Sequence, residues 1–332
     1  MPPLRNAQAG FYDHKGKGRH MSAGIQTYRF DEAVLRVRGV DVRGRGVDGK
    51  AGGSVQAYMY PFDPGIAGLN FRFSLDRVED RFYSPRHRHN FDQFRYVLSG
   101  TINIGKGMVL AQGECGYFPE GTYYGAQDQK GDGEALVLQF PGPQAAHYML
   151  QPEYKEGAAR LREGGAVFEN GVCRRTDAQG REINQDGFEA VWESYTGKPV
   201  TYASPRYGEP VIIKPEGFRW LPDPVRPGLE VRRLGTFNEY RTALSQWRLS
   251  PGTVIPGGTL EAPEFRFVLK GEVTFGGKTL SARGAAYIPA GIETGVMESR
   301  AGAEILVISI PMYTASLWRQ IRENQHAVAM TP

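Results

Sequence analysis

Cysteine is scarce in this chain, which has 332 residues and only two cysteines, Cys115 and Cys173. Two cysteines are too few for a disulfide framework, and they lack the paired spacing of a zinc or redox motif, so we expect free thiols. No uninterrupted apolar run reaches the roughly 18 residues of a membrane-spanning helix. The basic N-terminal residues are not followed by an apolar segment, so no secretory signal is predicted either. We expect a cytoplasmic protein without a membrane partner.

Charge is also unremarkable, with a formal net charge of +4 from 40 basic and 36 acidic residues. The basic residues are scattered and form no block of like charge, so a nucleic-acid partner is not expected. A glycine-rich phosphate loop and a nucleophile elbow are both missing, which leaves nucleotide and serine-hydrolase chemistry without support. Glycine (43), proline (22), phenylalanine (17) and tyrosine (17) are abundant, as in short aromatic strands joined by tight turns.

An internal repeat organises the chain. The segment FRYVLSG at 94–100 matches FRFVLKG at 265–271, an offset of 265 − 94 = 171 positions. Two further matches follow in the same order at nearly the same offset: GECGYFPEGTYYG (113–125) with GAAYIPAGIETG (284–295), and EALVLQFPG (134–142) with AEILVISIP (303–311). The chain therefore contains two copies of one structural unit.

Each unit consists of short apolar runs separated by Gly and Pro turns, the pattern of a β-barrel or β-sandwich. We predict an all-β fold of two tandem barrels with a few short helices, at 151–165 and 314–325, and an extended linker at 220–227. The predicted domains are an N-terminal arm (1–53), a first barrel (54–150), a connecting helix and linker (151–227), a second barrel (228–313) and a C-terminal helix and tail (314–332).

Two histidines stand at alternate positions in the first unit, His87 and His89, although the chain contains only six. Alternate side chains of a strand point to one face, so both imidazoles can converge on one point inside a barrel. Gln93 follows four residues later and opens the next strand, from which it can reach the same interior. The three side chains are therefore candidates for one site.

These residues resemble the cupin family, whose first motif is His-x-His-x(3,4)-Glu and whose second is Gly-x(5)-Pro-x-Gly-x(2)-His. The second motif fits here as Gly113, Pro119, Gly121 and Tyr124. The resemblance implies two cupin barrels in tandem, each a double-stranded β-helix or jelly roll. It departs from the family at two ligand positions, since Gln93 replaces Glu and Tyr124 replaces the third His.

The implied metal ligands are His87, His89, Gln93 and Tyr124, whose nitrogen and oxygen donors suit a divalent ion. Fe(II) is favoured, with Mn, Ni, Cu or Zn as alternatives. Neutral Gln binds more weakly than a carboxylate, and Tyr ligates well only as phenolate. Two alternatives stay open: the histidines are hydrogen-bonded residues of a barrel that has lost its metal, or Tyr124 is a catalytic hydroxyl that faces the substrate.

Strand parity adds Arg95, because an inward Gln93 predicts that Arg95 faces inward too. Its guanidinium would hold the acid group of a substrate beside the metal, or else form a buried ion pair. The second unit repeats this arginine as Arg266, two residues after Glu264, which favours the ion pair. Tyr117 and Tyr123 would line a substrate pocket or belong to the core.

The second unit lacks the histidines, since Gly258, Leu260 and Thr294 stand at the positions of His87, His89 and Tyr124. Only Glu264 remains of the ligand set, so a degenerate barrel without a metal is expected. The leading hypothesis is a mononuclear non-haem iron dioxygenase acting on a small carboxylate-bearing molecule. A metal-dependent isomerase, lyase or decarboxylase and a non-catalytic ligand-binding protein are the alternatives, and family analogy implies a homodimer through an exchanged N-terminal arm.

Overall fold

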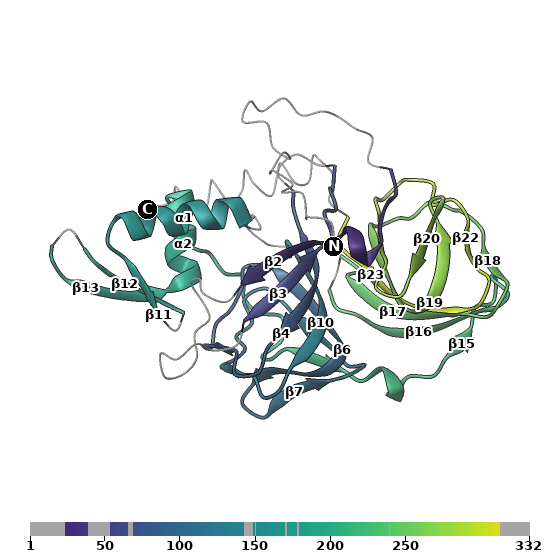
Figure 1. Ribbon diagram of the computed structural model, residues 1–332, viewed down its shortest axis with the longest axis horizontal. Coiled ribbons are helices and arrows are strands. Elements are labelled where there is room, and N and C mark those ends of the chain that lie inside the picture. Colours follow the sequence, from purple (N-terminus) through teal and green to yellow (C-terminus); the bar gives the residue numbers. More distant parts are fainter. Residues whose placement is uncertain are drawn as a thin grey trace, which may run out of the picture.

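The structure is a computed structural model that describes residues 24–38, 54–65, 69–142, 149, 151–169, 171–177, 179–238 and 240–312. Two β-barrels lie side by side, and a small helix-containing unit lies against the first barrel on the side away from the second (Figure 1). The predicted all-β class with a few short helices is confirmed. No helix in the described part of the chain is long and apolar enough to cross a membrane.

The first barrel contains an antiparallel sheet with the strand order β14-β8-β6-β10-β4-β3-β2, and β7 is attached to β6. A separate pair, β5 and β9, completes it. Their bounds are β2 (Val34–Arg38), β3 (Val55–Met59), β4 (Arg72–Val78), β5 (Tyr83–Ser84), β6 (Asp92–Gly105), β7 (Met108–Ala111), β8 (Cys115–Phe118), β9 (Gln127–Asp128), β10 (Gly133–Phe140) and β14 (Val211–Ile213).

The second barrel repeats this plan with the strand order β1-β21-β19-β23-β17-β16-β15, to which β18, β20 and β22 are attached. The bounds are β1 (Gln26–Tyr28), β15 (Leu221–Pro222), β16 (Leu229–Thr236), β17 (Ala243–Leu249), β18 (Thr253–Ile255), β19 (Glu264–Phe275), β20 (Lys278–Ser281), β21 (Ala285–Ile288), β22 (Met297–Ser299) and β23 (Ala303–Ser309). The three segments matched by the internal repeat form equivalent strands: β6 with β19, β8 with β21, and β10 with β23.

The largest apolar core lies between the barrels. Alternate residues of the central strands point into it, such as Phe73 of β4, Phe94 of β6 and Leu136 of β10, and they meet Phe265 of β19 and Ile308 of β23. The rings of Phe73 and Phe265 stack with centroids 4.9 Å apart. Because both barrels contribute to one core, each stabilises the other.

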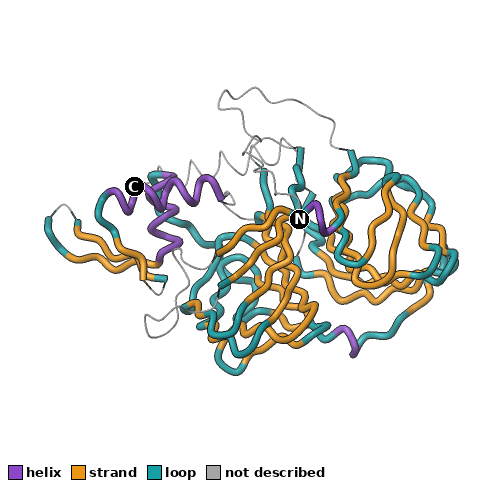
Figure 2. Tube along the Cα trace, in the orientation of Figure 1, coloured by secondary structure: helices purple, strands orange, loops and turns teal. Residues whose placement is uncertain are grey.

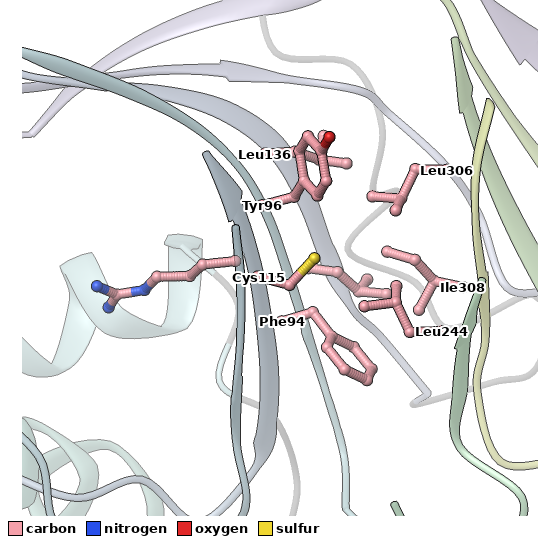
Figure 3. Close-up of a pocket in the computed structure, with 9 residues that line it drawn as sticks. Phe94, Tyr96, Cys115, Leu136, Leu244, Leu306 and Ile308 are labelled. Atoms are coloured by element: carbon pink, nitrogen blue, oxygen red, sulfur yellow. The ribbon is translucent and has the colours of Figure 1, made fainter. Parts of the chain in front are cut away.

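Close packing is incomplete at one point of this core. A small gap there is lined from the first barrel by Phe94, Tyr96, Cys115 and Leu136 and from the second by Leu244, Leu306 and Ile308 (Figure 3). The labelled side chains of the two barrels point toward one another across it. Among the side chains labelled in Figure 3, only Tyr96 and Cys115 carry a polar atom, a hydroxyl oxygen and a sulfur. The gap is therefore an apolar packing feature of the core.

The segment between the barrels is more structured than the predicted helix and linker. The predicted helix exists as α1 (Gln151–Glu163), but it is followed by a three-stranded sheet and a second helix. These are β11 (Val167–Glu169), β12 (Val172–Thr176), β13 (Glu182–Asp186) and α2 (Gly187–Thr196), and Figure 2 shows them as one unit beside the first barrel. A short 3-10 helix, η2 (Pro215–Gly217), follows β14. In the predicted linker at 220–227, β15 pairs with β16.

Helix α2 has clear local signals at both ends. The Asp186 side chain accepts hydrogen bonds from the backbone N–H groups of Phe188 and Glu189, which caps the first turn. Gly197 ends the helix in the left-handed conformation, with φ of 72°. The buried Phe188 and Trp192 lie one helical turn apart and pack against Phe91 of the first barrel. The inserted unit is therefore attached to the barrel through this helix.

The N-terminal arm connects the two barrels of the same chain. Strand β1 pairs with β21 of the second barrel, whereas β2 pairs with β3 of the first. Between them lies the short 3-10 helix η1 (Phe30–Glu32), whose Glu32 accepts a hydrogen bond from Lys278 at 2.6 Å. The segments at 1–23, 39–53 and 314–325, and with them the predicted C-terminal helix, lie outside the described residues.

We predict that Phe265→Ala destabilises both barrels together. Phe265 is fully buried between rings of the two barrels, so its loss leaves a cavity that should cost about 3–5 kcal/mol. The measurement is urea denaturation followed by circular dichroism. Phe218→Ala is the control, because this exposed ring should change stability by no more than about 0.5 kcal/mol. An unchanged midpoint for Phe265→Ala would contradict a shared core.

Candidate functional site

The predicted site residues His87 and Tyr124 face each other across a short antiparallel bridge. The backbone N–H of His87 donates to the Tyr124 carbonyl at 3.0 Å, and the N–H of Tyr124 donates to the His87 carbonyl at 2.9 Å. At the corresponding positions of the second barrel, the N–H of Thr294 donates to the Gly258 carbonyl at 2.9 Å and the N–H of Gly258 donates to the Thr294 hydroxyl at 3.0 Å. The sequence equivalence of these positions therefore holds in three dimensions.

A glycine turn holds the histidine segment in place. The N–H of Gly121 donates to the His89 carbonyl at 2.7 Å. The φ of Gly121 is +77°, a value that residues other than glycine rarely adopt. A Cβ atom at Gly121 would also approach the Ala203 carbonyl oxygen within 2.1 Å. The Pro-x-Gly element of the second motif therefore positions both the histidines and the segment that follows α2.

The tautomer of His87 is fixed by its surroundings. Its Nδ1 lies 2.7 Å from the Pro85 carbonyl oxygen, which can only accept, so Nδ1 carries the proton. The lone pair is then on Nε2. Metal-binding histidines commonly have one nitrogen held by a carbonyl in this way, which orients the other toward the ion.

His89 and Arg95 meet at the Tyr124 hydroxyl. The Tyr124 oxygen lies 2.7 Å from Nε2 of His89 and 3.1 Å from Nη2 of Arg95. Because the arginine can only donate, the hydroxyl can accept from Arg95 and donate to His89. The ring centroids of His87 and His89 are 4.9 Å apart, so two imidazoles, one phenol and one guanidinium gather at this place.

Gln93 faces the same interior but makes different contacts. Its side chain lies within hydrogen-bonding distance of the Gln139 amide, at 2.5 Å. With its amide oxygen turned toward Arg95, that oxygen accepts from Nε at 3.0 Å and from Nη2 at 3.3 Å. These bonds connect Gln93 to Gln139 and Arg95, and its predicted role as a metal ligand stays a prediction.

A buried ion pair lies further along this face of the sheet. Gln139 is the cross-strand neighbour of Arg72 on β4, and the guanidinium of Arg72 pairs with Asp76. Ser74 also donates to Asp76, at 2.7 Å. The carboxylate of Asp76 is therefore already neutralised and hydrogen-bonded.

The structure decides between the two readings of Arg95. In the described residues no carboxylate forms an ion pair with Arg95, whose partners are the Tyr124 hydroxyl, the Gln93 amide and the Phe118 and Tyr124 rings. Arg266 does form the predicted pair, because its Nη2 lies 2.9 Å from Glu264. The ion-pair alternative thus holds for the second barrel only.

The two predicted substrate-contacting tyrosines lie elsewhere. Tyr117 is on the opposite face of β8 from Phe118, so its ring is buried in the core between the barrels and its hydroxyl donates to Asp92 at 2.8 Å. Tyr123 alternates with the inward Tyr124 and is partly exposed, with Arg86 and Arg88 against its ring. Tyr117 therefore belongs to the core, the second of the two alternatives, and Tyr123 stacks with arginines.

Sequence reasoning missed an aromatic wall beside His89. Phe91 stacks on the His89 ring with a centroid distance of 4.3 Å, and Phe188 of α2 approaches the same ring edge-on at 6.0 Å. Phe91 was readable as the next alternate residue after His89. Phe188 comes from the inserted unit, and the only sequence signal for it was its position two residues after Asp186, which caps α2.

A buried acidic group at the barrel junction was also missed. Asp92 accepts hydrogen bonds from the backbone N–H of Glu120 at 2.9 Å and from Asn238 of the second barrel at 3.4 Å. Burial raises the pKa of Asp92 to about 6, against the opposing effect of these hydrogen bonds. Arg206 pairs with Glu120 at 3.2 Å. This group connects both barrels with the segment after α2 on the face of β6 opposite the histidines.

Both cysteines are free and buried, as predicted. Burial raises the pKa of Cys115 well above its usual value and also raises that of Cys173. A thiol that stays protonated is a poor nucleophile. The described residues also contain no cluster of three or more His, Cys, Asp or Glu side chains that could hold a metal.

The comparisons with known proteins identify the fold. No protein-family profile matches the chain, and no curated protein matches it by sequence. Among solved structures, a protein of Nostoc punctiforme provisionally described as a dioxygenase is similar with a TM-score of 0.57 and 12% identity over 88% of this chain and 84% of that one.

Two further structures have the same overall architecture. A protein of Pseudomonas aeruginosa provisionally described as glyoxylate-induced is similar with a TM-score of 0.51 and 12% identity over 92% and 98% of the two chains. Oxalate decarboxylase of Bacillus subtilis, which has Mn(II) centres, is similar with a TM-score of 0.50 and 13% identity over 89% and 79%. At these identities the likeness shows a fold of two cupin barrels.

We predict that Tyr124→Phe lowers the free energy of unfolding by about 1–3 kcal/mol, because it removes the hydroxyl that pairs with both His89 and Arg95. Denaturation in urea measures the change. The matched control is Tyr123→Phe, whose hydroxyl makes no hydrogen bond to a described residue and whose loss should change stability by no more than about 0.5 kcal/mol. Equal stability of the two variants would show that the buried hydroxyl network contributes nothing.

Proposed function

We propose that the first barrel binds a divalent transition metal through His87 and His89, with Tyr124 as the third ligand, and acts as an enzyme on a small carboxylate-bearing molecule. The observation that carries the proposal is the fixed tautomer of His87. Its Nδ1–H is held by the Pro85 carbonyl, so the lone pair is on Nε2. The second barrel has Gly258 and Leu260 at the corresponding positions and is proposed to bind no metal.

The donor set fits such an ion. Two neutral imidazoles and one phenol oxygen are nitrogen and oxygen donors that suit Fe, Mn, Ni, Cu or Zn. The Arg95 guanidinium donates to the Tyr124 oxygen at 3.1 Å, and phenolate is the form in which tyrosine is a good ligand. When bound, the metal would act as a Lewis acid or would bring a chelating substrate and O2 into one coordination sphere.

The chain's own groups have distinct tasks in this proposal. Arg95 binds the carboxylate of the substrate, because its guanidinium forms no ion pair in the described part of the chain. The Tyr124 oxygen, between His89 and Arg95, would ligate the metal beside the bound molecule. Phe91 and Phe188 cover the His89 ring and keep water from that side of the site.

As the finer assignment we propose an iron-dependent dioxygenase, with Lewis-acid isomerisation, lyase or decarboxylation chemistry as the alternative if another metal is bound. A metal-free ligand-binding role is the second candidate. One observation favours it: the Tyr124 hydroxyl already pairs with Nε2 of His89, the atom that a metal would need. A homodimer stays part of the proposal on family analogy alone.

Elemental analysis of the purified untagged protein tests the metal. We expect nearly one metal ion per chain, lost in the double variant His87→Ala/His89→Ala because both imidazole donors are gone. Leu260→Ala, at the second-barrel position that corresponds to His89, is the control and should keep the metal. Iron would support a dioxygenase and direct oxygen-uptake assays toward aromatic carboxylates, whereas Mn, Ni, Cu or Zn would support Lewis-acid chemistry. Wild-type protein without metal, even after reconstitution, would refute the metal proposal.

A further inference from the structure

Gln93 and Arg95 of the first barrel occupy the same places as Glu264 and Arg266 of the second. Gln93 is the cross-strand neighbour of Phe118 and Gln139, and Glu264 is that of Ile288 and Ser309 on the equivalent strands.

The two arginines correspond in the same way. Arg95 lies between Gly116 and Val137, and Arg266 lies between Ala286 and Val307. The two barrels therefore have one two-residue arrangement with a single chemical difference, an amide in place of a carboxylate.

In the second barrel these two residues form an ion pair without net charge. Glu264 accepts from Nε of Arg266 at 3.1 Å and from Nη2 at 2.9 Å, and the pair is buried. Apolar side chains complete the surroundings of the guanidinium, with the Trp247 ring centroid at 4.9 Å and that of Phe275 at 5.1 Å. The positive charge of Arg266 is therefore neutralised by Glu264, and its neutralisation does not require an anion from outside the barrel.

In the first barrel the same charge has no counter-ion among the described residues. The Gln93 amide stands in the place of the carboxylate, and with its oxygen turned toward Arg95 it accepts from Nε at 3.0 Å, but an amide carries no net charge. The only acidic group of the described residues on this interior face, Asp76, is paired with Arg72. The Gln93–Arg95 pair therefore carries a charge of +1, whereas the Glu264–Arg266 pair sums to zero.

We infer that Gln93 keeps the charge of Arg95 available, so that a small organic carboxylate binds beside the Tyr124 hydroxyl and supplies the counter-charge that Glu264 supplies in the second barrel. The inference rests on the proposed function for its location, because it names the ligand class of the same barrel interior, but it does not require the metal. Gln93 is then a specificity-determining residue in place of a metal ligand.

The test is calorimetric titration of chelator-treated, metal-free protein with benzoate and acetate, and with the neutral analogues benzamide and acetamide. We expect saturable binding of one carboxylate per chain and at least tenfold weaker binding of the amides. Gln93→Glu should weaken carboxylate binding at least tenfold, because the new side chain neutralises Arg95 as Glu264 neutralises Arg266. Gln93→Met is similar in size and uncharged, so it should stay within a few-fold of wild type.

The second barrel provides the reciprocal comparison. Glu264→Gln should leave carboxylate binding in the first barrel unchanged while lowering the thermal midpoint, since it leaves Arg266 buried without its partner. Gln93→Glu should not lower the midpoint. If Gln93→Glu unfolds, retained binding by Gln93→Met together with loss of binding in Arg95→Met still supports the inference.

Three results would overturn the inference: no carboxylate binding by folded metal-free protein, equal binding of benzoate and benzamide, or wild-type affinity in Gln93→Glu. These outcomes are separate from the metal test. Carboxylate binding by a protein that never acquires metal would refute the proposed metal enzyme and leave this inference standing. A stoichiometric metal together with wild-type carboxylate affinity in Gln93→Glu would instead support the proposed metal enzyme and refute this inference.

Discussion

The central strands point alternate side chains into two places, the interior of their own barrel and the core between the barrels. The rest of the structure depends on this alternation. Strand β6 shows it most clearly, because Phe94 faces the other barrel while Gln93 and Arg95 face the interior of their own. A slip of one residue would exchange the two sets and place an arginine in the shared apolar core. The large buried area between the barrels therefore fixes which side chains can form a site.

The same reasoning explains what could be predicted from the sequence. The repeat defined both barrels, since a three-part match at one offset is independent of any single strand assignment. Parity placed Arg95 correctly because Gln93, Arg95 and their neighbours belong to one uninterrupted strand. Parity was not carried through the second motif, where Tyr117 stands one position before the inward Phe118 of β8 and therefore faces the core between the barrels.

The inserted unit could not be predicted from the repeat, because it has no counterpart in the second half of the chain. Local signals were present nonetheless: Asp186 as a cap, Phe188 and Trp192 one turn apart, and Gly197 as a stop. These signals predict a helix, but they do not predict which part of the protein the helix packs against. That Phe188 would approach His89 depends on contacts between segments about 100 positions apart, which local propensity does not encode. The same holds for the Arg206–Glu120 pair.

The pairing of β1 with β21 has a consequence for biosynthesis. Tyr28 lies opposite Ala285, so strand β1 requires a partner that is translated 285 − 28 = 257 residues later. During elongation on the ribosome the first barrel can form while β1 and the apolar face of β6 still lack their second-barrel partners. A nascent chain of this protein therefore exposes an unpaired strand and an aromatic surface until the second barrel has been synthesised, a period in which chaperone binding would protect it from association with other chains.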